Sequence, residues 1–272
     1  MFSRFVFGVI IACPLLAQGV KIQYDPVSSD VVKARLDRNP ATNGERAAAL
    51  HKMFEEAGCS GAMLVDQAVD GAKQPNVICT TEGGGPSMIV IGAHIDFAGP
   101  GKGLVENWSG ASLLPSLFEA LRETPRKHKF VFVGFADREN GRRGSNFYLK
   151  SLGLEGKNKI KAMVNVEALG LSQTKVQMDN CDPGLLQKMA SIAKPLGFGV
   201  KGANNDLVAE SDAKTFYDAK IPVISVHSLY GADKKIPGTY ADNPSAYHGT
   251  EYYYESYKLI AAFLAYLDES LD

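Results

Sequence analysis

The sequence has no excess of charge of either sign. Its 29 lysine and arginine residues are balanced by 30 aspartate and glutamate residues, which gives a formal net charge of −1. A nucleic acid or an anionic membrane surface attracts a basic excess, so the charge gives no argument for either as a partner. The sequence also lacks internal repeats and low-complexity tracts. Its 45% hydrophobic and 22% charged content is ordinary for a folded globular protein.

The apolar run near the N-terminus is short. Residues 5–11 follow the positively charged Arg4, precede small residues, and are too few to span a bilayer. This pattern resembles a secretory signal, so we expect residues 1–20 to be a signal peptide, cleaved after Ala17, and the protein to be exported to the periplasm or beyond. Segment 10–13 also resembles a bacterial lipoprotein box, which would instead leave a lipidated Cys13.

Cysteine is scarce, with only Cys13, Cys59, Cys79 and Cys181 in 272 residues. Four cysteines do not make a disulfide framework, and after signal removal at most one bridge can form. Cys59 with Cys79 is a candidate pair, because export permits disulfides. Isolated buried thiols are the alternative.

Strands alternate with helices along residues 21–272. Apolar, β-branched runs at 87–93, 129–136, 161–167 and 221–227 are typical of strands buried on both faces. Helical spacing follows at 109–122, where Pro115 predicts a kink or a late helix start, and at 183–196 and 251–267. We therefore expect one α/β domain, a three-layer α/β/α sandwich around a mixed, mainly parallel sheet. No linker divides it.

Polar side chains follow the ends of the predicted buried strands. His94 and Asp96 close the strand at 87–93, Glu139 follows the strand at 129–136, and Glu167 ends the strand at 161–167. Open α/β sheets place their sites at the C-terminal ends of the strands. Glu106 opens the intervening amphipathic run. The sequence therefore predicts that these groups form one site.

The order of these motifs resembles metallopeptidase family 28, from roughly Asn76 to the C-terminus. The pattern is His94-x-Asp96, then an acid-Asn-x-Ser-Gly segment beginning at Glu106, then Glu139 two residues before a glycine, then an acid ending a strand. The resemblance implies a zinc-exopeptidase-like fold with two zinc ions. It also implies hydrolysis of a terminal peptide bond in a peptide substrate, with the glutaminyl cyclases as related enzymes.

The resemblance also implies a role for each residue. His94 would bind zinc, with Asp96 as the partner that fixes its tautomer. Glu106 would bridge both metals, whereas Glu139 and Glu167 would each bind one of them. Imidazole and carboxylate ligands suit zinc. Glu106 and Glu167 stand where the family has aspartate, so each side chain is longer by one methylene.

The last ligand of the family is a histidine in a late loop, often followed by an aspartate. His248 is the obvious candidate by residue type. Spacing back from the C-terminal helix would instead place this ligand near Thr239, with Asn243 in place of the aspartate. Both alternatives stay open at the level of sequence.

The chain departs from the family at Arg138, which stands where the family has its general-base glutamate. Arginine has no acceptor lone pair and stays protonated, so Arg138 cannot take a proton from water. The sequence therefore predicts an exported zinc-dependent aminopeptidase-type hydrolase that is weak or inactive. The alternative is a non-catalytic descendant that binds peptides or another protein in the same cleft.

Overall fold

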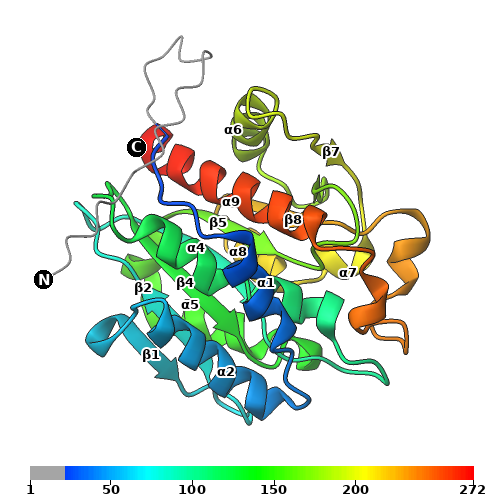
Figure 1. Cartoon of the computed structure of the whole chain (residues 1–272). Helices are drawn as coiled ribbons and strands as arrows, with labels where there is room; N and C mark the ends of the chain where they lie inside the picture. The colour runs from blue at the N-terminus through cyan, green and yellow to red at the C-terminus, as the bar shows by residue number, and fades with distance from the viewer. Residues whose placement is uncertain (1–21) are drawn as a thin grey trace, which may run out of the picture.

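A computed structural model of the chain describes residues 22–272. The expected signal peptide at residues 1–20 and the expected lipid attachment at Cys13 lie outside the described residues, so both stay predictions. Eight strands form one sheet in the order β1-β2-β4-β3-β5-β8-β6-β7. Helices lie on either side of it (Figure 1).

The strands are β1 Leu64–Gln67, β2 Asn76–Thr80, β3 Met88–His94, β4 Lys129–Phe135, β5 Ile160–Val166, β6 Lys175–Val176, β7 Lys201–Gly202 and β8 Val223–His227. The helices are α1 Ser29–Asp37, α2 Asn43–Glu56, α3 Ser109–Ala111, α4 Leu114–Leu121, α5 Arg143–Asn158, α6 Pro183–Ala193, α7 Asp206–Ala209, α8 Asp212–Asp218 and α9 Glu251–Ser270.

The centre of the sheet is parallel. β3 lies between β4 and β5, and β8 pairs with the other side of β5, all in the same direction. Antiparallel strands flank this centre: β2 pairs with β4 at one side, and β6 pairs with β8 at the other. The predicted fold class, an α/β/α sandwich with a mixed, mainly parallel sheet, is confirmed.

The two faces of the sheet are covered by different helices. Side chains alternate between the faces of a strand, so Phe132 and Phe135 of β4 point to opposite sides. Phe132 packs against Phe118 of α4, in the layer that also holds α2, α6 and α9. Phe135 packs against Tyr148 of α5 and Phe216 of α8. Both strand faces are therefore apolar, and polar chemistry is left to the strand ends.

The helical segment around Pro115 is interrupted rather than kinked. A π-helical turn at Leu104–Trp108 and the short α3 precede α4, which begins at Leu114 with Pro115 in its first turn. Proline lacks an N–H group, and the first turn of a helix leaves such groups unpaired, so Pro115 is tolerated there. Of the two expected outcomes, the late helix start is the one found.

Among residues 22–272, no helix is both long and apolar enough to cross a membrane.

A disulfide joins Cys59, after α2, to Cys79 on β2. We expect replacement of both residues by alanine to lower the free energy of unfolding by about 3 kcal/mol, because the bond closes a loop with a sequence separation of 20. Urea unfolding under oxidising conditions measures this loss. Reduction of the wild type should reproduce it, whereas Cys181→Ala, at the free cysteine, should not. Equal stability of the oxidised and reduced protein would contradict the prediction.

Candidate metal centre

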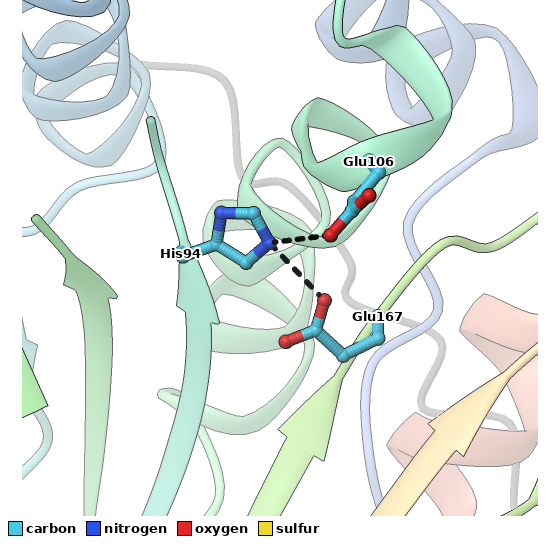
Figure 2. A group of neighbouring side chains, drawn as sticks. All are labelled: His94, Glu106 and Glu167. Atoms are coloured by element: carbon cyan, nitrogen blue, oxygen red, sulfur yellow. Dashed lines mark ion pairs between the residues drawn. The ribbon is translucent and has the colours of Figure 1, made fainter. Parts of the chain in front are cut away.

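Three predicted ligands meet at the C-terminal edge of the parallel strands. His94 is the last residue of β3, Glu167 follows β5 directly, and Glu106 lies in the turn that precedes α3. Figure 2 shows one nitrogen of the His94 imidazole facing both glutamates. His94 and Glu167 are fully buried and Glu106 is 6% exposed. This is the only group of three or more potential ligands that the described residues bring together.

The distances fit a tetrahedral metal ion. His94 Nε2 lies 3.3 Å from Glu167 Oε2 and 3.6 Å from Glu106 Oε1. Ligand atoms held about 2.0–2.2 Å from a tetrahedral zinc are about 3.3–3.6 Å apart. All three atoms are buried and have no hydrogen-bond partner within the chain. Since buried polar atoms are normally paired, these three atoms are suited to a shared cation.

The main chain orients the imidazole of His94. Nδ1 lies 2.8 Å from the carbonyl oxygen of Asp96, which can only accept, so Nδ1 carries a proton and Nε2 faces the glutamates. Burial alone would lower the pKa of His94, but Glu167 and Glu106 outweigh it and hold this pKa well above its ordinary value. The two carboxylates therefore favour the protonated form of the imidazole. A metal ion must displace its proton.

Asp96 acts differently from the expected partner of His94. Its carboxylate oxygen is 3.8 Å from His94 Nδ1, too far for a hydrogen bond. The carboxylate instead accepts hydrogen bonds from the main-chain N–H groups of Arg138 and Glu139, at 3.0 and 3.1 Å. Asp96 therefore reaches His94 through its main chain and fixes the loop after β4 through its side chain.

Arg138 lies beside the three ligands. Its Nη1 donates to Glu139 Oε1 at 2.6 Å and lies 3.4 Å from Glu106 Oε1, while Nη2 donates to the carbonyl oxygen of Leu207 at 2.9 Å. Burial alone would lower the pKa of Arg138, but Glu167, Glu106 and Glu139 raise it above its ordinary value. Arg138 is therefore a permanent cation at this site.

The Asn-x-Ser-Gly segment after Glu106 ties this turn to the residues after β5. Asn107 donates to the carbonyl oxygen of Val166 at 2.8 Å, and Leu169 N–H donates to the Ser109 hydroxyl at 2.9 Å. A side chain at Gly110 would meet the Val166 oxygen at 2.4 Å, so only glycine fits. These residues hold Glu106 against the segment that carries Glu167.

Asp242 is a positioning residue that sequence analysis missed. Its carboxylate accepts hydrogen bonds from the main-chain N–H groups of Val105 at 2.7 Å and Glu106 at 3.3 Å. Burial raises the pKa of Asp242 to about 6. These partners lie 137 and 136 residues away along the chain, so no local pattern could have revealed the contact.

We expect Asp242→Ala to weaken zinc binding by about 10–100-fold, because Glu106 would lose the support of its main chain. A competition titration with a chromophoric zinc chelator measures the change. The side chain of the adjacent Asn243 bonds only within its own loop, to Tyr240 and Ser245, so Asn243→Ala is the matched control. Equal affinity in the Asp242 variant and the wild type would contradict this positioning role.

The structure does not bring every predicted site residue into the group. His248 is exposed in the loop before α9 and lies outside it, and Thr239 is exposed and bonds to the main chain of its own turn. Glu139 is paired with Arg138 and is not one of the three clustered ligands.

The profile of peptidase family M28 matches residues 76–260, more than half of the chain. An aminopeptidase of Pseudomonas aeruginosa is 31% identical over 109 residues, which are 40% of this chain and 20% of that protein. The chain thus aligns with a small part of this relative. The LapA aminopeptidase of Legionella pneumophila has a similar structure, with a TM-score of 0.77 and 22% identity over 90% of this chain and 73% of that one.

A zinc aminopeptidase from Bacillus subtilis, BSAP, has the same fold, with a TM-score of 0.64 and 18% identity over 73% of this chain and 50% of that one. At these identities the structural likeness shows the fold alone. The matched range 76–260 contains His94, Glu106 and Glu167, the three residues whose side chains meet at the sheet edge. By its sequence profile, the chain belongs to peptidase family M28.

Proposed function

We propose that this protein is a zinc-dependent aminopeptidase-type peptide hydrolase with a low catalytic rate. The observation that carries the proposal is the convergence of three buried atoms that have no hydrogen-bond partner: His94 Nε2, Glu106 Oε1 and Glu167 Oε2. These residues would hold the zinc. A bound zinc ion polarises the carbonyl group of a peptide and lowers the pKa of water.

The low rate follows from Arg138. The position that the family gives to a proton-accepting glutamate holds a guanidinium whose pKa is raised by the glutamates around it. General-base catalysis contributes about 10²–10⁴-fold, and we expect this factor to be missing. Peptides are the expected substrates.

The test is elemental analysis after dialysis against trace zinc, followed by hydrolysis assays on amino-acid anilides. Bound zinc with slow, chelator-sensitive hydrolysis would support the proposal. A folded protein that takes up no zinc would overturn it.

Arg138 favours a second candidate function, a non-catalytic peptide-binding protein. For that function we expect bound zinc and measurable peptide affinity, with no turnover that exceeds the chelator-treated sample.

We also propose that the protein is exported. The disulfide between Cys59 and Cys79 supports this, because such bonds persist in oxidising compartments. Fractionation of the source cells, followed by mass spectrometry of the N-terminus, tests the proposal. The same spectrum separates cleavage after Ala17 from lipidation at Cys13. Recovery of the intact chain from the cytoplasm alone would overturn export.

A further inference from the structure

The guanidinium of Arg138 lies where two glutamates from different elements converge. Glu106 comes from the turn before α3, and Glu139 comes from the 3₁₀ turn after β4. One atom, Arg138 Nη1, contacts both carboxylates, at 3.4 and 2.6 Å. Glu106 Oε1 is also 3.6 Å from His94 Nε2. The same oxygen therefore faces the proposed zinc position on one side and a fixed positive charge on the other.

This guanidinium is held in place. The Arg138 side chain is only 10% exposed, Nη2 donates to the Leu207 carbonyl oxygen, and the main chain of Arg138 is bound by Asp96. A planar guanidinium held at several points loses little freedom when it binds carboxylates. Arg138 is therefore a permanent part of the site rather than a mobile surface charge.

Charge balance limits how many metal ions the site can take. The carboxylates of Glu106, Glu139 and Glu167 face the site, and His94 is neutral when it binds a metal. Their three negative charges are balanced by one guanidinium and one divalent ion. The nearby carboxylates of Asp96 and Asp242 accept main-chain N–H groups. The carboxyl group of Asp212 is also buried near His94 and Glu167, and burial raises its pKa to about 7, so it adds at most a partial negative charge at neutral pH. A second divalent ion beside Arg138 would leave two positive charges uncompensated at a largely buried site.

We propose that Arg138 is a built-in cation that replaces a second metal ion between Glu106 and Glu139. The native site then takes one divalent ion, on His94, Glu106 and Glu167. Loss of the guanidinium would leave two glutamates facing each other without a positive charge, which is a site for a second divalent ion. The proposal rests on the zinc site proposed above, but its test counts bound ions and does not depend on hydrolysis.

The experiment is equilibrium dialysis of the full chain against a zinc buffer, with elemental analysis of zinc per chain. We expect about one ion in the wild type and about two in Arg138→Ala. The double variant Arg138→Ala with Glu139→Gln should return to about one, which would locate the added ion. Arg142→Ala is the matched control, because Arg142 pairs with exposed Glu210 and its loss changes the net charge equally. That variant should keep about one ion.

The outcomes separate this proposal from the proposed function. Two ions in the wild type, or one in Arg138→Ala, would overturn the proposed role of Arg138. The proposed zinc-dependent hydrolase function would remain supported. No ion in the wild type but at least one in Arg138→Ala would overturn both the hydrolase and the one-ion site, because Arg138 would then exclude metal altogether. No ion in either protein would overturn both. Circular dichroism and thermal melts check that each variant is folded, and Arg138→Lys, which keeps the charge, should stay at about one ion.

Discussion

Replacement of Arg138 by glutamate is expected to raise the rate of amino-acid anilide hydrolysis by about 10²–10⁴-fold, which is the usual contribution of a general base. The substitution removes a group that can only donate and supplies a carboxylate at the position where the family has its base. The loop that carries it is already fixed, because Asp96 accepts the main-chain N–H groups of residues 138 and 139. The measurement is kcat/KM under saturating zinc.

Charge balance favours the same outcome. With glutamate in place of Arg138, four carboxylates would face the site, and two divalent ions would balance them. The control is Arg138→Gln, which also removes the positive charge but supplies no base. Equal gains in the two variants would show that the charge of Arg138, rather than the missing base, limits the rate. No gain in either would count against a site that is otherwise competent.

The fold was predictable because its central strands are formed by continuous apolar segments of the sequence. The β-branched residues before His94 and the run at 221–227 fit strands buried on both faces, and the structure places them there as β3 and β8. The strands β6 and β7 have only two residues each, which is too short to show the alternation of side chains that identifies a strand in a sequence. The start of α4 needed the structure, because Pro115 fits either a kink or a first turn.

The site was predictable where its residues belong to short motifs. His94, Glu106 and Glu167 each sit in a motif or at a strand end, and the structure brings all three together. Their partners could not be predicted in the same way. Asp242 acts on a turn more than a hundred residues away, and the pairing of Arg138 with Glu139 depends on side-chain direction rather than on spacing.

The longer side chains of Glu106 and Glu167 still bring their carboxylates to His94. One extra methylene moves a carboxylate by roughly 1.5 Å, whereas a metal tolerates ligand distances within about 0.2 Å. Both carboxylates still place an oxygen 3.3–3.6 Å from His94 Nε2. The turn that carries Glu106 is held in this position by the hydrogen bonds of Asn107 and Asp242.

His94→Ala is expected to abolish measurable zinc binding and, with it, hydrolysis. The loss should exceed the roughly 100-fold that removal of a residue orienting a ligand can cost, because a ligand itself is removed. The metal-free protein should also lose about 3–5 kcal/mol of stability, because Glu106 and Glu167 would keep buried charges without the imidazolium between them. Zinc titration and urea unfolding measure the two effects separately.

His248→Ala is the control for this prediction, since it makes the same chemical change at the other histidine that the sequence offered as a ligand. His248 is exposed and lies outside the group, so its loss should leave zinc affinity unchanged and stability within about 0.5 kcal/mol. A large loss of zinc in this variant would mean that the late loop folds over the site when metal binds. Loss in the His94 variant alone would place the ion at the end of β3. Because the two variants share one substitution and differ only in position, their difference reports the site rather than the chemistry of histidine.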